Sequence, residues 1–177
     1  MRCAGQVGDV FQPTRRQHSM SAIYVKIEGI TGESKDSKHK GWVDVLDFSY
    51  RVSQSTSVFT GGGGGVGKAD FAPLAFTHFY DRASPVLFGF CAAGKHIPKV
   101  LISACKAGGK QEEFLRITLS DVVLTHVEPG GTSGSMPAES VGMAYSKIEA
   151  EAREQNADGS MGAAVAAGWD VKENRLV

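Results

Sequence analysis

The chain has 177 residues, 42% of them hydrophobic, so it can bury the core of one domain and is not a disordered polyelectrolyte. Its 19 basic and 19 acidic side chains give a net charge of zero at neutral pH, and the basic residues form no cluster. The sequence therefore does not indicate the basic surface by which proteins bind nucleic acid or anionic membranes. Its longest nearly apolar runs, residues 86–93 and 161–168, are too short to span a bilayer.

The three cysteines, Cys3, Cys91 and Cys105, form no C-x-x-C pair, so they predict neither a disulfide framework nor a zinc site. Reduced thiols in a protein made in the cytoplasm fit this pattern. The histidines also lack the H-x-H or H-x-x-x-H spacing that is typical of metal ligands. We therefore predict no metal and no cofactor.

The N-terminal segment is polar and irregular, and no apolar segment follows Arg15 and Arg16, so it does not form a Sec signal peptide. Met20 has the position expected of a natural start. We expect residues 1–19 to be a disordered extension, derived from an upstream start codon or a cloning remnant. Residues 20–177 are expected to form one domain.

Alternating apolar and polar residues predict half-buried strands over residues 22–28, 42–52 and 68–80. Two sets of side chains are each expected to share one face of the second and third strands: Leu46, Phe48, Tyr50 and Val52, then Leu74, Phe76, His78 and Tyr80. Pro73 predicts an edge position or a bulge, because proline donates no hydrogen bond to a sheet.

One short helix is predicted after residue 83. Ser84 is the expected N-cap, Pro85 occupies the first helical position, and Gly94 ends the helix. The apolar side chains at helical spacing form one stripe: Val86, Leu87, Phe90 and Cys91. We expect this helix to cover one end or side of a sheet structure, because it is too short to carry a fold alone.

Two long strands, near residues 113–128 and 141–152, change the face on which their apolar residues lie. Leu115, Ile117 and Leu119 are followed by Val122 and Leu124; Val141, Met143 and Tyr145 are followed by Ile148, Ala150 and Ala152. Such a switch predicts a bulge or a sharp bend. Two switches favour a closed or nearly closed barrel over a flat sandwich, with residues 97–106 as a further strand and 168–171 as a short closing strand.

The segment from Gly62 to Lys68 resembles a phosphate-binding loop but does not meet its requirements. Ala69 follows the lysine where a magnesium-binding Ser or Thr is needed, and a strand pattern follows where a helix is needed. Nucleotide binding is therefore not predicted. The glycine run instead suggests a long flexible arm that orders on contact with a neighbouring protein, against the alternative of a surface loop without a role.

The sequence shows no catalytic constellation above background. Cys91 and His96 resemble a nucleophile and a base, but Cys91 lies on the apolar stripe, where a buried and inert thiol is expected. No serine lies in a G-x-S-x-G motif. Glu149 and Glu151 share a strand face and fit a solvated stripe better than an acid/base pair. We predict that the protein is not an enzyme.

A series of collinear motifs resembles the haemolysin co-regulated (Hcp) family. They lie at residues 24–34, 39–41, 44–46, 53–55, 61–68, 81, 84–85, 94–98, 106–108 and 168–171. Among them are Gly-Glu-Ser at 32–34, Gly-Lys-His-Ile-Pro at 94–98 and Gly-Trp-Asp-Val at 168–171. The resemblance covers nearly the entire domain, whereas the family does not normally carry residues 1–19, and residues 129–137 differ in detail.

The resemblance implies a mainly β fold: a compact β-barrel of two curved sheets with one short α-helix on its side. It also implies a structural subunit of the type VI secretion inner tube. Homohexameric rings would stack into a tube, capped by a trimeric spike, enclosed by a contractile sheath and able to carry small effector proteins in the lumen. Assembly would take place in the cytoplasm, and export to the extracellular space or a target cell would need no Sec signal.

Ring contacts are expected on strand edges and the outer barrel face, where a neighbour can pair or cover an exposed edge. The predicted arm, which would project along the tube axis to the next ring, comprises Ser53, Gln54, Ser55, Gly61, Gly62, Gly63, Gly64, Gly65, Gly67 and Lys68. A second predicted contact loop, at the ring face or in the lumen, comprises Gly32, Glu33, Ser34, Lys35 and Asp36.

Two other functions compete with this prediction. An Hcp barrel fused to an effector enzyme would need a substantial extra domain, for which we see no room before Met20 or after Trp169. A monomeric ligand-binding barrel would need an apolar cavity. The mass of the particle in solution distinguishes it from a ring.

Overall fold

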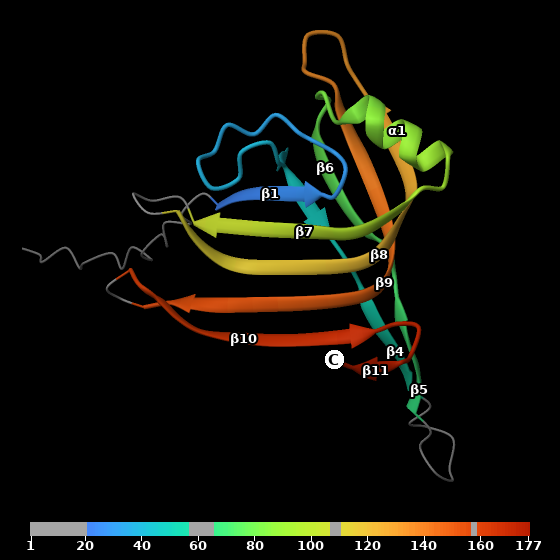
Figure 1. Ribbon diagram of the computed structural model, residues 1–177, viewed down its shortest axis with the longest axis vertical. Coiled ribbons are helices and arrows are strands. Elements are labelled where there is room, and N and C mark those ends of the chain that lie inside the picture. Colours follow the sequence, from blue (N-terminus) through green and yellow to red (C-terminus); the bar gives the residue numbers. More distant parts are fainter. Residues whose placement is uncertain (1–20, 57–65, 107–110, 157–158) are drawn as a thin grey trace, which may run out of the picture.

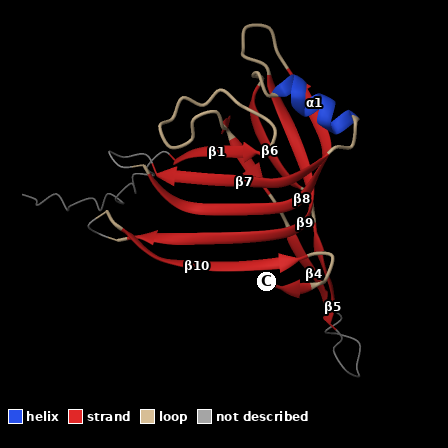
Figure 2. Cartoon of the chain, in the orientation of Figure 1, coloured by secondary structure: helices blue, strands red, loops and turns tan. Residues whose placement is uncertain are grey.

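The computed structural model describes residues 21–56, 66–106, 111–156 and 159–177 (Figure 1). The predicted extension over residues 1–19 and the glycines Gly61–Gly65 lie outside these described residues. The elements are β1 (Ser21–Ile27), β2 (Val43–Val45), β3 (Asp47–Ser49), β4 (Val52–Thr56), β5 (Val66–Phe71), β6 (Leu74–Phe79), α1 (Ser84–Ala92), β7 (His96–Lys106), β8 (Glu112–Gly130), β9 (Ala138–Gln155), β10 (Met161–Asp170) and β11 (Arg175–Leu176). Figure 2 shows the helix beside a structure built of strands. The mainly β prediction is confirmed.

One antiparallel sheet forms most of the molecule. Its strands follow the order β11-β10-β9-β8-β7-β1-β2, and β6 pairs with both β3 and β9. β2 and β3 do not pair with each other, so strand pairing alone does not close the sheet. Only Leu46 separates them in the chain, and its N–H donates to the carbonyl of Thr77 in β6 at 2.8 Å. The barrel is therefore nearly closed, with the chain itself crossing the gap.

The predicted bends in β8 and β9 are present and face each other. Asp121 has a φ of 52° and lies between the buried Leu119 and Val122, which moves the inward face by one residue. Aspartate tolerates this left-handed conformation better than most residues. The Ser146 hydroxyl of β9 donates to Asp121 Oδ2 at 2.7 Å. Both long strands can therefore turn together and serve the two halves of the barrel (Figure 1).

The core confirms one predicted face and overturns another. Leu74, Phe76 and His78 of β6 are buried as expected, whereas Tyr80, the fourth residue of that predicted face, lies beyond the end of β6 and is exposed. In the segment 42–52, however, Val43 and Val45 are buried, whereas Leu46 is 48% exposed, and Tyr50 and Val52 are also exposed. The prediction was wrong for two reasons. Apolar residues lie at both odd and even positions of this segment, and the strand is interrupted at Leu46, so one alternating pattern does not describe the whole segment.

The helix is present, but its cap differs from the prediction. Its N-cap is Ala83, not Ser84. The Ser84 hydroxyl instead accepts the backbone N–H of Asp81 at 3.0 Å, and Asp81 Oδ1 accepts the N–H of Ala83 at 2.8 Å. These bonds fix the turn before the helix, and Gly94, with a φ of 58°, follows its end as expected. Leu87 is buried against the barrel, whereas Phe88 faces solvent.

A buried contact between a histidine and a glutamate joins β6 to β9. His78 and Glu139 are cross-strand neighbours, both are almost fully buried, and His78 Nε2 lies 2.8 Å from Glu139 Oε1. The two atoms are close but do not meet the geometry of a hydrogen bond. Asp81 Oδ1 lies 3.9 Å from His78 Nδ1, and burial raises the pKa of the Asp81 carboxyl.

Removing one partner of this pair is expected to destabilise the fold strongly, because the other polar group stays buried without its partner. His78→Ala should lower the free energy of unfolding by about 3–5 kcal/mol, measured by urea denaturation. Glu151→Ala, which removes the solvent-facing pair with Arg153, is the control and should cost less than about 1 kcal/mol. Equal losses for the two variants would contradict the assignment.

Candidate functional site

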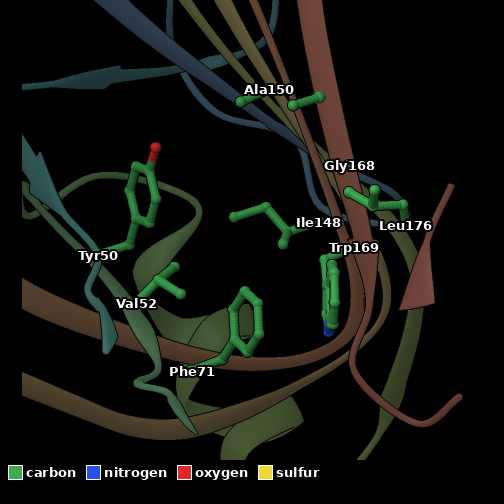
Figure 3. Close-up of a pocket in the computed structure, with 9 residues that line it drawn as sticks. Tyr50, Val52, Phe71, Ile148, Ala150, Gly168, Trp169 and Leu176 are labelled. Atoms are coloured by element: carbon green, nitrogen blue, oxygen red, sulfur yellow. The ribbon is translucent and has the colours of Figure 1, made fainter. Parts of the chain in front are cut away.

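An open apolar groove lies between the start of the β4–β5 hairpin and the sheet formed by β9 and β10 (Figure 3). One wall carries Tyr50, Val52 and Phe71, and the opposite wall is formed by Ile148, Ala150, Ala167, Gly168, Trp169 and Leu176. The rings of Phe71 and Trp169 stack with their centroids 6.3 Å apart. A contiguous apolar surface of this kind is typical of a contact site for another protein.

The described part of the predicted arm is a β-hairpin. Ser53, Gln54 and Ser55 lie in β4, and Gly67 and Lys68 lie in β5. The strands pair antiparallel, with Val52 opposite Phe71 and Ser53 opposite Asp70, and they extend away from the barrel at the lower end of Figure 1. A strand, not a helix, follows Gly67, so this segment lacks the helix N-terminus that a phosphate-binding loop requires.

Strand β10 is exposed on both faces. Ala163 to Ala167 are all exposed, including Val165 at 76%, and the strand carries no charge before Asp170. One edge pairs with β9, whereas on the other edge only Trp169 and Asp170 pair with a described strand, β11. An exposed apolar edge strand is a template for pairing with another chain. In the sequence, the apolar run over residues 161–168 predicts only that the segment is too short to span a membrane.

The predicted contact loop belongs to a compact segment that we call the strap, residues 31–42. The N–H of Gly32 donates to the carbonyl of Gly41 at 2.8 Å, and the N–H of Gly41 donates to the carbonyl of Ser34 at 2.9 Å. Ser34 is buried, and Glu33 Oε1 accepts the backbone N–H of Arg82 at 3.2 Å. Lys35 is exposed, and Asp36 is partly buried where it bonds His39.

Ser103, His39 and Asp36 have the connectivity of a catalytic triad that sequence reasoning missed. His39 Nε2 lies 3.2 Å from Ser103 Oγ, and His39 Nδ1 lies 2.7 Å from Asp36 Oδ1. The spacing of Asp36 and His39 was visible in the sequence, but Ser103 is 64 positions from the histidine. Ser103 is almost fully buried, and its hydroxyl bonds Glu113 Oε2 at 2.5 Å. A substrate cannot reach it, so the arrangement is structural.

Cys91 and His96, which were not expected to act as nucleophile and base, each contact other groups. Cys91 is half-buried, and its Sγ lies 3.9 Å from the carbonyl of Leu124. His96 is exposed and bonds Asp121 Oδ1 at 2.9 Å. Within the described residues, no group of three His, Cys, Asp or Glu side chains could hold a metal ion. No helix in that part of the chain is long and apolar enough to cross a membrane.

The fold is a nearly closed β-barrel with an exposed apolar edge strand and an open apolar groove. The family model described as "Type VI secretion system effector, Hcp" matches residues 24–151. Protein hcp1 of Pseudomonas aeruginosa is 39% identical over 155 residues, covering 86% of this chain and 96% of the relative. The crystal structure of Hcp1 from Salmonella typhimurium is 34% identical with a TM-score of 0.75, covering 89% of this chain and 99% of that one.

A further solved structure, described as that of a type six secretion system protein, is 26% identical with a TM-score of 0.85, covering 89% of this chain and all of that one. The chain belongs to the Hcp family. It is a structural tube and effector protein of type VI secretion and not an enzyme. Members of this family are secreted and assemble with copies of themselves.

The strap requires a glycine at position 32. A Cβ there would lie 2.3 Å from the backbone oxygen of Trp42, so Gly32→Ala should lower the free energy of unfolding by about 2 kcal/mol or more. Gly89→Ala is the control. Gly89 lies on the exposed face of α1, and a Cβ added there would meet no atom within 4 Å outside its own helix, so the substitution should stabilise the protein by about 0.5–1 kcal/mol. Thermal denaturation of both variants checks the prediction, and a stable Gly32→Ala protein would contradict it.

Proposed function

We propose that the chain forms hexameric rings through two different flanks of each subunit. The first flank is the edge of β10 together with the groove beside Trp169. The second is the opposite end of the sheet path, formed by β1, β2 and the strap. A contact between unlike surfaces of identical copies closes a ring when its rotation divides the circle.

The observation that carries this proposal is the exposure of β10. A chain that stayed solitary would present an apolar edge strand to water on both faces, which favours aggregation. Natural proteins usually shorten, charge or cover such an edge, and β10 is neither short nor charged before Asp170. Because the chain belongs to a self-assembling family, we propose that a neighbouring copy covers this edge.

The rings are proposed to stack into a tube, with the β4–β5 arm contacting the next ring. Residues 32–36, at the margin of the second flank, are proposed to lie at the ring face or in the lumen. Weak contacts repeated around a ring can hold such a stack. The remaining proposals rest on the family: assembly in the cytoplasm, export on contraction of the sheath, contact with the spike, and carriage of small effectors in the lumen.

The flank is tested by placing a charge on β10. Val165→Lys should leave the subunit folded, because the side chain is 76% exposed in the single chain, but should abolish the ring. Phe88→Lys is a matched control, because this apolar side chain on α1 is 67% exposed and lies outside both proposed flanks. Circular dichroism checks folding, and light scattering after size exclusion measures mass. A hexamer in the Val165→Lys protein, or a wild-type protein that remains monomeric at high concentration, would refute the proposal.

The arm is tested separately by deleting Gly61–Gly65. The flank residues are unchanged, so rings should still form, whereas stacking into tubes and secretion should be impaired. Negative-stain images distinguish single rings from tubes. A deletion variant that stacks and is secreted like the wild type would show that the arm has another role.

A further inference from the structure

We infer that the C-terminal hairpin, residues 171–177, is a register stop for ring assembly. It occupies the outer edge of β10 at residues 168–170 and confines a neighbouring copy to residues 162–167. The inference rests on the proposed function, because it concerns how the β10 flank meets the next subunit. It adds the element that fixes the position of that subunit along the strand.

The hairpin is bonded to the sheet at both of its ends. The N–H of Val171 donates to the carbonyl of Ser146 in β9 at 2.8 Å. The N–H of Val177 donates to the carbonyl of Gly168 in β10 at 3.2 Å. Between these bonds the chain reverses at Asn174, which has a φ of 53°, a left-handed conformation that asparagine tolerates. The last residues therefore have a defined place on the edge of β10 before any neighbour binds.

The lack of a side chain at Gly168 lets the hairpin lie close to β10. A Cβ at this position would lie 2.8 Å from Cγ2 of Val177 and 2.9 Å from Cγ of Glu149. Next to it, Leu176 pairs with Trp169 and lines the apolar groove. The hairpin is thus a built part of the flank that the neighbour meets.

The hairpin leaves a defined stretch of open edge. The Gly168 carbonyl points to the outer edge, where Val177 bonds it, and the backbone groups of every second residue in a strand point the same way. The N–H and carbonyl groups of Ala164 and Ala166 therefore also point outward, and none of the described strands pairs with them on that side. A strand of the neighbouring copy can add at these positions, but the hairpin blocks it from reaching Asp170.

The side chains of β10 give the neighbour little information about register. From Gly162 to Gly168 they are two glycines, four alanines and Val165. On the face that holds Ala164 and Ala166, a slip of two residues only exchanges one alanine for another. Register is weakly specified in strands of this kind, so an element outside the open stretch has to specify it.

A slip would change the shape of the whole assembly. Two residues of a strand span about 7 Å. If each contact were displaced by that distance along the strand, the rotation between copies would become a screw, and the copies would form an open helix instead of a closed ring. The hairpin should therefore determine whether the assembly closes.

The test is deletion of residues 175–177, which removes β11 and leaves the barrel and the open stretch of β10 unchanged. Mass photometry and negative-stain images compare the assemblies at equal concentration, and circular dichroism checks folding. The wild type should give closed hexamers of one mass. The deletion protein should lose this single mass and give a mixture of open assemblies.

Two point variants accompany the deletion. Val177→Pro keeps the chain length but removes the N–H that bonds Gly168, so it should shift the population in the same direction. Arg175→Ala is the matched control, because it removes only the exposed ion pair with Glu173 and keeps the backbone of β11. It should give closed hexamers like the wild type.

Closed hexamers from the deletion protein would overturn the inference alone. A folded deletion protein that stays monomeric would also overturn it, since the hairpin would then be an anchor and not a stop. If the deletion protein does not fold, the Val177→Pro result decides. A wild-type protein that forms no ring would overturn the proposed function and the register stop with it.

Discussion

The structure depends on one paired constraint, the simultaneous bends of β8 and β9. Asp121 adopts a left-handed backbone conformation, and its carboxylate receives the hydroxyl of Ser146 from the facing strand. Lys172 and His96 also bond this carboxylate, and their hydrogen bonds, that of Lys172 foremost, hold the pKa of Asp121 well below its usual range. The four groups come from β8, β9, the start of β7 and the turn before β11. The carboxylate therefore ties the corner of the barrel together.

This corner explains why the surfaces lie where they do. Because β8 and β9 cross from one half of the barrel to the other, the first part of β9 pairs with β6 and its second part with β10. The second part carries β10 and β11 beyond the barrel, where no second layer covers them fully. The hairpin of β4 and β5 extends beside them, and the apolar groove lies between the two (Figure 3). We propose that a neighbouring copy completes this flank.

Local patterns in the sequence carried much of this information, and contacts across the chain carried the rest. The two switches of apolar parity predicted the bends correctly, because a bend must exchange the faces of a strand. The alternation in residues 42–52 misled, since the strand breaks at Leu46 and apolar residues lie on both faces. The Ser84 cap was misplaced by one residue because Asp81 competes for the same role in the turn. The contact of His39 with Ser103 could not be predicted, since no local pattern joins β7 to the strap.

The candidate site was predictable only in part. The arm residues were located by their unusual composition, but their pairing as a hairpin was not expected, because serines and glycines read as coil. The exposure of β10 could not be predicted from the sequence either. An apolar run has the same composition whether the core of its own chain or another copy covers it. The most direct measurement of the central claim is an electron cryomicroscopy map of the assembled particle that traces the backbone. The account predicts a ring in which the outer edge of β10 is buried against the β1–β2 flank of the next subunit. A ring in which that edge faces solvent would contradict it.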